Sequence, residues 1–427
     1  MTDLKSIECD LCVIGSGLAG MAVALFAADR GLRVAQTGHT GEIIFASGLL
    51  DLLAVCPIGE RRLWRNPWAA LDALIYDYPE HPYTLINKDH IKAAFNDILN
   101  FLKTIGLPYH RGTGYNSGVP TALGTIKQTY AVPHTMWNGV SACKEKSAGL
   151  IVDIRGLKGF SARQIAASLR AEWPGLRSAR ISFPGMDHLN EVYAERMANA
   201  LLLPYNREKL AAVVRPLVKK STVVGLPAIL GLHQTVEIKS HLEKLIGVPI
   251  FEIPTIPPSV PGLRLKEAFE RGLRSRGVQY FSLTKALKVR PSAAGRFETH
   301  VGRDAVEHSV DSRGVILASG RFIGGGLHAD RKRIRESIFD LPVDQPAGRA
   351  TWHRRDFLNP RGHPINRAGL NIDRFFRPVG DSGEPAFETL FAAGSILAHN
   401  DWKRLKCGAG LAIASAYAAV DSYLKIA

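Results

Sequence analysis

The stretch CDLCVIGSGLAGMAVALFAADRGLRVAQTG, residues 9–38, decides the fold expected for this chain. Its apolar runs at 11–14 and 32–35 are typical of buried strands, and the longer run at 18–29 is typical of a helix. A glycine-rich turn, Gly15-Ser16-Gly17-Leu18-Ala19-Gly20, lies between the first strand and the helix. The order of strand, glycine turn, helix and strand predicts a parallel βαβ unit.

The glycine turn matches the GxGxxG pattern of Rossmann-like nucleotide-binding folds. In such turns the first glycine permits the tight bend, the second lets a phosphate approach the backbone, and the third lets helix and strand pack closely. The helix N-terminus then presents N–H groups and a positive dipole end to the anion. The turn therefore predicts nucleotide or flavin binding, with these contacts: Gly15, Ser16, Gly17, Leu18 and Gly20.

An acid that would hold an adenosine ribose is missing after the second strand. FAD proteins of this kind carry Glu or Asp there, but this chain has Thr37 and Gly38, and its next acid is Glu42. One interpretation is FMN, which has no adenosine to hold. The other is FAD, with hydroxyl and backbone groups in place of the acid. The residues leave both open.

Late segments of the chain favour a flavin over a nicotinamide. VILASG (315–320) and FAAGS (391–395) are buried strands that end in small-residue turns, and CGAG (407–410) opens the last helix. In two-domain flavoproteins such strands return to the cofactor. They add Gly320, Gly394, Ser395 and Gly408 as expected contacts, and ASG (46–48) adds Ser47 and Gly48, for which a plain turn is the alternative.

The length and motif order predict an α/β protein with a split flavin domain. A chain of 427 residues with 46% hydrophobic residues can form about two or three domains. The flavin domain is expected from 1–150 and 301–427, with a second α/β domain inserted at 151–300. No window approaches the roughly 18 apolar residues of a membrane span. The polar start, MTDLKSIE, shows no signal peptide, so a cytoplasmic protein is expected.

Charge and cysteine content narrow the expected partners. Lys and Arg number 54 against 39 Asp and Glu, a net charge of +15 that favours anionic partners such as phosphorylated substrates, acidic lipids or an acidic subunit. The charge is dispersed, which argues against RNA, and the densest run, RKRIR (331–335), suggests a solvated helix face. Cys9 and Cys12 form a lone CxxC without partners, so no metal site is expected.

Other segments give coarser expectations. The pattern predicts helices at 88–106, 161–173 and 263–275, little regular structure at 57–83, and loops or an antiparallel ribbon at 112–142. Residues 308–320 suggest a strand, a turn and a second strand.

Four segments resemble a known family along nearly the whole chain: FASGLLDLL (45–53), HPYTLI (81–86), PTIPPSVPGLRL (254–265) and ILASGRFIGGGLHADRKRIRESIFDLPV (316–343). They resemble the B subunit of anaerobic glycerol-3-phosphate dehydrogenase. The resemblance implies a flavoprotein, assigned FMN, beside an FAD-containing A subunit. A third, iron–sulfur subunit would anchor the pair to the inner face of the cytoplasmic membrane. The implied complex oxidises sn-glycerol 3-phosphate to dihydroxyacetone phosphate and passes electrons to quinone.

The expected chemistry needs a base for the hydroxyl proton and cations for the phosphate. His328, Arg331 and Arg335 follow the glycine-rich FIGGGL and are candidates, with Arg264 and Arg321 as further cations, although each has a structural role as its alternative. No base is named, because the family's alcohol chemistry can reside in the A subunit. The alternative function is an electron-transfer or scaffold subunit of a different redox complex.

Overall fold

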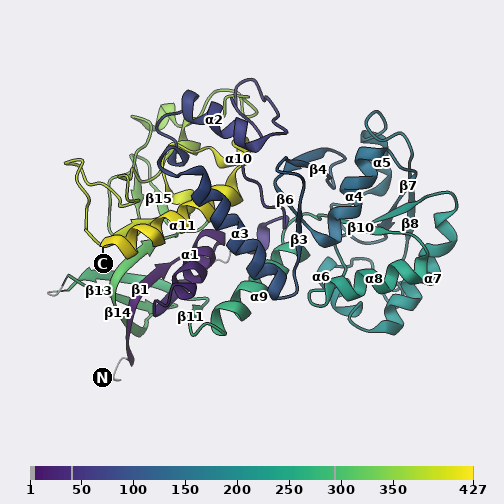
Figure 1. Cartoon of the computed structure of the whole chain (residues 1–427), viewed down its shortest axis with the longest axis horizontal. Coiled ribbons are helices and arrows are strands. Elements are labelled where there is room, and N and C mark those ends of the chain that lie inside the picture. The colour runs from purple at the N-terminus through teal and green to yellow at the C-terminus, as the bar shows by residue number, and fades with distance from the viewer. Residues whose placement is uncertain (1–4, 40–41, 293–294, 427) are drawn as a thin grey trace. The chain divides into compact units, whose positions relative to one another are not determined.

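The computed structural model describes residues 5–39, 42–292 and 295–426 (Figure 1). The chain forms two compact units. Unit 1 comprises residues 1–43, 51–98 and 269–427, and unit 2 comprises 44–50 and 99–268. These limits differ from the expected boundaries at 150 and 300. Residues 99–150 join unit 2 because the helix at 134–145 packs on its sheet. Residues 269–300 join unit 1 because they add strands to its sheet.

The main sheet of unit 1 has seven strands, in the order β11-β2-β1-β14-β13-β12, with β17 paired to β14. The strands of unit 1 are β1 (Lys5–Ile14), β2 (Val34–Gly38), β11 (Gln279–Ser282), β12 (Lys285–Pro291), β13 (Phe297–Gly302), β14 (Val306–Leu317), β15 (Leu327–Ala329), β16 (Ile334–Glu336) and β17 (Leu390–Ala392). Its helices are α1 (Leu18–Asp29), α2 (Pro67–Asp77), α10 (Trp402–Leu405) and α11 (Gly408–Ile426).

The glycine turn lies where the strand order of this sheet reverses. β2 and β14 run parallel to β1 on its two sides, and β17 runs parallel to the end of β14. Ligands of open parallel sheets bind at such a switch point, beyond the carboxyl ends of the strands. Helices α1 and α11 pack against each other beside the sheet (Figure 1). Residues 19–27 of α1 are all buried, which explains why this helix is apolar on every face.

Unit 2 contains a four-stranded parallel sheet in the order β10-β9-β7-β8. Ile151 and Val152, neighbours on β7, belong to different apolar clusters because successive side chains of a strand point to opposite faces. The strands of unit 2 are β3 (Tyr109–Arg111), β4 (Ser117–Pro120), β5 (Ile126–Thr129), β6 (Ala131–Pro133), β7 (Gly149–Ile154), β8 (Leu176–Ile181), β9 (Val223–Pro227) and β10 (Ile250–Ile253).

The helices of unit 2 are α4 (His134–Glu145), α5 (Ala162–Ser168), α6 (Ala194–Ala200), α7 (Pro204–Val218) and α8 (Thr235–Ile246). Two more, α3 (Lys88–Thr104) and α9 (Val260–Arg274), run across the division between the units. Short 3-10 helices are η1 (Glu42–Phe45), η2 (Pro82–Leu85), η3 (Arg349–Thr351), η4 (Pro364–Arg367) and η5 (Gly394–Ile396).

Several local expectations are wrong. The segment 308–320 is not two strands, because β14 continues unbroken through Asp311 and Arg313 while β1 pairs along it. The run 331–335 is not a helix face but part of the turn between β15 and β16, followed by the first two residues of β16. Segment 57–83 contains α2, whose start is capped by the Asn66 side chain. The ribbon at 112–142 is present as β4–β5, but its last part is the start of α4.

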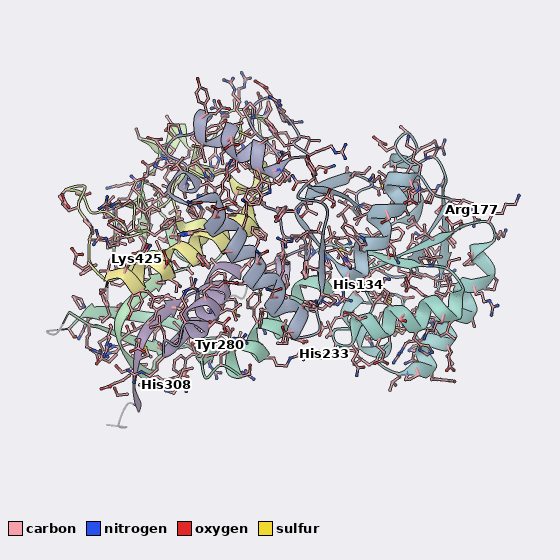
Figure 2. The ribbon with its side chains drawn as sticks, viewed as in Figure 1. His134, Arg177, His233, Tyr280, His308 and Lys425 are labelled. Atoms are coloured by element: carbon pink, nitrogen blue, oxygen red, sulfur yellow. The ribbon has the colours of Figure 1, made fainter. Side chains whose placement is uncertain are left out.

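The basic residues are dispersed over both units. Arg177 lies on β8 in unit 2, and Lys425 pairs with Asp421 on α11 of unit 1 at 2.7 Å (Figure 2). Cys9 and Cys12 are buried on β1, where burial raises the pKa of Cys9 to about 12. Among the described residues, no group of three or more His, Cys, Asp or Glu side chains could hold a metal ion.

No helix in the described part of the chain is both long and apolar enough to cross a membrane. Of the polar N-terminal stretch, residues 1–4 lie outside the described residues, and β1 begins at Lys5.

Candidate functional site

The glycine turn between β1 and α1 is held in place by backbone contacts. Gly15 has φ +136°, and a Cβ on it would lie 2.1 Å from the carbonyl oxygen of Ala318. Its N–H donates to Thr37 O at 2.7 Å. A Cβ on Gly20 would lie 2.0 Å from Gly15 O. Gly15 and Gly20 are therefore required by the packing of the turn on β2 and β14.

Gly17 differs from its two neighbours in the motif because the space beside it is open. A Cβ on Gly17 would meet no atom within 4 Å. Gly17 is also the N-cap of α1 and supplies no side-chain hydrogen bond to the first turn. The N–H groups at the start of α1 can therefore bind an anion that approaches Gly17. We call Gly15–Gly20 and this open space the glycine cradle.

Late segments of the chain pack directly against the glycine cradle. Ala19, Ala318 and Ala412 form one apolar cluster from α1, the end of β14 and α11. Gly394, in the left-handed conformation at φ +81°, would bring a Cβ to 2.6 Å from the Ala19 Cβ. Its N–H donates to Ser415 Oγ at 2.8 Å. The expected return of the late strands to the glycine turn is thus present within unit 1.

The N-terminus of α11 is partly closed by the chain itself. Gly410 N–H donates to Asp51 O at 2.6 Å, and a Cβ on Gly410 would lie 2.4 Å from the Tyr83 hydroxyl. Gly408 packs on the ring of Trp402, where a Cβ would lie 2.7 Å from Cε3. The tight packing of these glycines explains their presence here, whereas contact of Gly320, Ser395 and Gly408 with a cofactor stays a prediction.

The end of β2 leaves no room for an acidic side chain. A Cβ on Gly38 would lie 2.3 Å from the Cβ and Oγ of Ser16 and 2.5 Å from the Ser16 backbone nitrogen. The preceding Thr37 is buried, and its Oγ1 is 2.8 Å from Thr284 Oγ1. The missing acid is therefore a packing feature, since the glycine cradle lies directly against Gly38.

Ser47 and Gly48 belong to unit 2, so their contact with a cofactor stays a prediction. Gly48 has φ +81°, and a Cβ on it would lie 2.7 Å from Pro261 Cβ. Its carbonyl accepts a hydrogen bond from the Tyr109 hydroxyl at 2.7 Å. Ser47 Oγ accepts from Leu49 N–H at 3.4 Å.

The cationic candidates have structural partners. Arg264 is buried in unit 2, where it forms an ion pair with Glu252 at 2.6 Å. Arg321 is held by the carbonyl oxygens of Asn366, Leu397 and Asn400, and burial lowers its pKa to about 10.

His328 and Arg335 are cross-strand neighbours in the β15–β16 hairpin, and they line a cavity of about 910 Å³. Arg335 forms an ion pair with Asp330 at 3.3 Å, whereas Arg331 is exposed on the turn. The structure thus brings two of the three candidates together, and their catalytic role stays a prediction.

Two further groups of polar residues were not singled out by the sequence. In unit 2, His110 Nε2 is 2.8 Å from His134 Nδ1, and the His110 ring stacks on Trp137 (Figure 2 labels His134). Burial lowers the pKa of both histidines. In unit 1, the segment RRDFLNPRGHPINR (354–367) lines a cavity of about 620 Å³. Its density of Arg and His among Gly and Pro was the signal that could have identified it.

Comparisons with known proteins cover almost the whole chain. The model of the family described as FAD binding domain matches residues 10–411. The chain is 29% identical over 423 residues to the B subunit of anaerobic glycerol-3-phosphate dehydrogenase from Pectobacterium carotovorum subsp. carotovorum (strain PC1), covering 97% of this chain and 98% of that protein. It is 28% identical over 429 residues to the protein of the same name from Vibrio cholerae serotype O1, covering 97% and 96%.

Among solved structures, the chain is similar to 3-ketosteroid delta1-dehydrogenase from Sterolibacterium denitrificans in complex with 1,4-androstadiene-3,17-dione. The TM-score is 0.44 at 13% identity, covering 98% of this chain and 99% of that one. The names of the curated relatives confirm the resemblance predicted from the four sequence segments.

Proposed function

This chain belongs to the FAD binding domain family, and from that premise we propose that it is the flavin-carrying B subunit of an anaerobic glycerol-3-phosphate dehydrogenase. Within that complex the proposed reaction is the oxidation of sn-glycerol 3-phosphate to dihydroxyacetone phosphate. The observation that carries the proposal is the full-length likeness to curated relatives that bear this name. The open glycine cradle supports it independently, because a flavin subunit needs a place for phosphate groups.

The cofactor proposed for this chain is FAD, with FMN as the alternative. The description of the family supports FAD, and the open space beside Gly17 leaves the backbone there accessible to phosphate groups. A bound flavin supplies a hydride acceptor for the alcohol carbon. Gly15 and Gly20 shape the turn, while the first-turn N–H groups of α1 bind phosphate oxygens. Because Gly38 carries no acid, the adenosine ribose would be held by hydroxyl and backbone groups instead.

The partners and the electron route are proposed from the same likeness. The word subunit in the names of the relatives supports assembly with other chains. We propose an FAD-containing A subunit and an iron–sulfur subunit that passes two electrons to quinone at the inner face of the cytoplasmic membrane. The excess of basic residues supports an anionic substrate and an acidic membrane surface.

The deciding experiment uses the complex purified with its partners. Heat-released flavin is identified by chromatography and counted per complex, and flavin bleaching is followed on adding sn-glycerol 3-phosphate, lactate or succinate. The proposal expects two FAD per complex and bleaching by glycerol 3-phosphate alone. One FAD and one FMN would favour the alternative cofactor. A single flavin per complex would mean that this chain carries none, and bleaching by another hydroxy compound would point to a different redox complex.

A further inference from the structure

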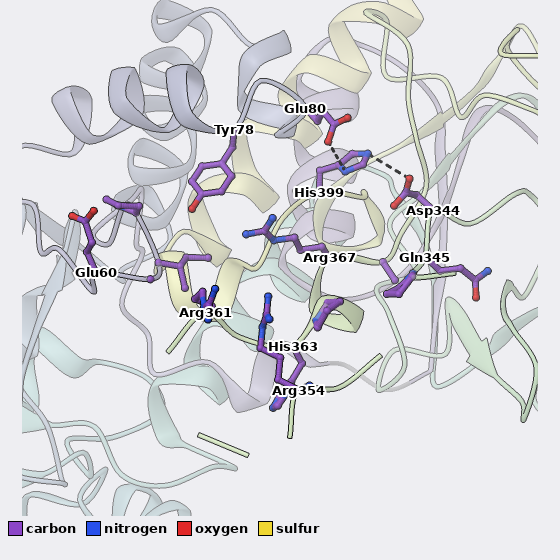
Figure 3. Close-up of a pocket in the computed structure, with 16 residues that line it drawn as sticks. Glu60, Tyr78, Glu80, Asp344, Gln345, Arg354, Arg361, His363, Arg367 and His399 are labelled. Atoms are coloured by element: carbon purple, nitrogen blue, oxygen red, sulfur yellow. Dashed lines mark hydrogen bonds and ion pairs between the residues drawn. The ribbon is translucent and has the colours of Figure 1, made fainter. Parts of the chain in front are cut away.

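A cavity of about 620 Å³ in unit 1 lies outside the glycine cradle (Figure 3). Its volume is in the range of small-molecule sites. Its walls come from the segment after the cis Cys56–Pro57 peptide, the residues after α2, the long segment 344–368, and His399, which lies three residues after η5. The side chains that give it chemical character are Glu60, Tyr78, Glu80, Asp344, Arg354, Arg361, His363, Arg367 and His399.

One side of this pocket is cationic. Arg354, Arg361 and Arg367 line it, and within the described residues 5–39, 42–292 and 295–426 none of these three guanidinium groups forms an ion pair with a carboxylate. Arg367 lies over the Tyr78 ring, with Cζ 5.2 Å from the ring centroid. Such a contact orients a guanidinium and leaves its N–H edge available. Arginine forks of this kind bind phosphate oxygens in pairs.

The segment that carries these arginines is fixed by its own hydrogen bonds. Arg354 N–H donates to His363 Nδ1 at 3.0 Å, so the proton of the neutral ring is on Nε2, which donates to Phe357 O at 3.0 Å. Arg354 Nε also donates to Gly362 O at 3.0 Å. The pocket wall is therefore preorganised, which lowers the entropic cost of binding a ligand.

The other side of the pocket carries hydrogen-bond acceptors. His399 follows η5, and its backbone is in the left-handed region at φ +61°, which is unusual for a residue other than glycine. Its Nδ1 is 3.5 Å from Glu80 and its Nε2 is 3.9 Å from Asp344, as the dashed lines in Figure 3 mark. Nε2 also lies 2.7 Å from Asn371 Oδ1. A histidine flanked by two carboxylates suits hydroxyl groups rather than a second anion.

Arg321 connects this pocket to the carboxyl edge of the sheet. It follows Gly320 at the end of β14 and donates to Asn366 O, beside Arg367, and to Asn400 O at 3.0 Å, beside His399. The same residue therefore supports both sides of the pocket and the strand end that packs on the glycine cradle. Ligands of parallel sheets bind at this edge.

We propose that this pocket binds a small phosphorylated polyol. The phosphate lies against Arg354, Arg361 and Arg367, and the hydroxyl groups face His399 and the carboxylates beside it, Glu80 and Asp344. The choice of polyol rests on the proposed function, which names glycerol 3-phosphate, whereas the phosphate site follows from the unpaired arginines alone.

The test measures binding to the full-length chain by calorimetry, with sn-glycerol 3-phosphate, inorganic phosphate and glycerol as separate ligands. We expect the two phosphates to bind, glycerol 3-phosphate more tightly, and glycerol not to bind. The variants Arg361→Gln and Arg367→Gln each remove a charge-assisted hydrogen bond and should weaken phosphate binding by about tenfold or more. The control is Arg374→Gln, which removes an exposed arginine of unit 1 that does not line the pocket.

Three outcomes would contradict the proposal. The first is that neither phosphate binds. The second is that Arg361→Gln and Arg367→Gln leave phosphate affinity unchanged. The third is that Arg374→Gln lowers phosphate affinity as much as they do, which would indicate a general charge effect. Equal affinity for inorganic phosphate and glycerol 3-phosphate would overturn the role of His399. The proposed function can fail separately. If phosphate binding depends on Arg361 and Arg367 but glycerol 3-phosphate does not bleach the flavin of the complex, the phosphate site stands and the dehydrogenase function is wrong.

Discussion

Each unit contains a sheet with adjacent parallel strands, and the carboxyl ends of these strands differ between the units. At the edge of the unit 1 sheet, β1 ends in the glycine cradle, where the space beside Gly17 is open. At the edge of the unit 2 sheet, β9 ends at Pro227, and a side chain of the unit itself binds the loop that follows it. Arg264 Nε donates to Gly231 O at 2.7 Å, and its two terminal nitrogens donate to Glu252.

The buried ion pair between Glu252 and Arg264 has its hydrogen bonds satisfied within unit 2. Glu252 Oε1 also accepts from Leu230 N–H at 2.6 Å, so both carboxylate oxygens have partners. Burial would raise the pKa of Glu252, but the charge and hydrogen bonds of Arg264 hold it below the ordinary value. Polar groups at the unit 2 edge are therefore bonded within the chain, whereas the unit 1 edge leaves the space beside Gly17 open.

The largest expected effect on stability comes from breaking the buried ion pair at the edge of the unit 2 sheet. In Glu252→Ala, Arg264 loses its buried partner, and the free energy of unfolding should fall by about 3–5 kcal/mol. Denaturant unfolding measures the change, with the double variant Glu252→Met/Arg264→Met as the control that removes both charges. We expect that double variant to be more stable than Glu252→Ala. A loss below about 1 kcal/mol in Glu252→Ala would show that the buried ion pair does not hold this edge together.

The next effect concerns the glycine that shapes the open edge. Gly15→Ala places a Cβ 2.1 Å from Ala318 O at a φ of +136°, and neither backbone can yield cheaply. We expect a loss of about 3 kcal/mol in the free energy of unfolding, measured by denaturant unfolding. Gly31→Ala is the matched control, because Gly31 also has positive φ, +81°, but its Cβ would meet nothing within 4 Å. Equal losses in the two variants would show that φ, rather than the contact with Ala318, matters.

Unit 1 contains a buried base that stays neutral, His81, in contrast to the buried charge of Glu252 in unit 2. His81 in unit 1 accepts from Tyr83 N–H, and burial, together with the charges of Arg367 and His399, lowers its pKa from 6.5 to about 3. Because the unfolded chain binds this proton more tightly, stability present above pH 6.5 is lost as the pH falls. The contribution of His81 to this loss is about 2 kcal/mol at pH 5.

The variant His81→Asn keeps an acceptor for Tyr83 N–H but cannot titrate. Its unfolding free energy should therefore fall less than that of the natural chain between pH 8 and pH 5, by about 2 kcal/mol, as measured by urea unfolding at each pH. Parallel curves for the two proteins would rule out His81 as a source of acid sensitivity.

The smallest effect on stability is expected at the open position itself. Gly17→Val extends into free space at an extended backbone conformation, φ −75° and ψ 179°, so the free energy of unfolding should change by less than about 1 kcal/mol. Flavin retained by the purified complex should nevertheless fall by about tenfold, because the side chain occupies the approach of the phosphate. Unchanged flavin content, measured by absorbance, would mean that the glycine cradle holds no cofactor.

The α/β flavoprotein fold could be predicted because its signals are local. The order of strand, glycine turn and helix at 9–38 is confirmed by β1, α1 and β2, and the family match extends it to nearly the whole chain. The domain limits could not be predicted, because β12 and β13 join the unit 1 sheet through pairing with β14. The local sequence pattern predicts that a segment is a strand but not which strands it pairs with.

The candidate site divides in the same way. By itself the sequence determined where glycines were needed, since Gly15 and Gly20 follow from backbone geometry within a short segment. Only the tertiary structure decided which cations were already used: Arg264 is bound to Glu252 and Arg321 to distant carbonyls, whereas Arg361 and Arg367 have no carboxylate partner in the described chain. The physical reason is that conformation is set by adjacent residues, whereas the availability of a charge depends on which partners the fold brings to it.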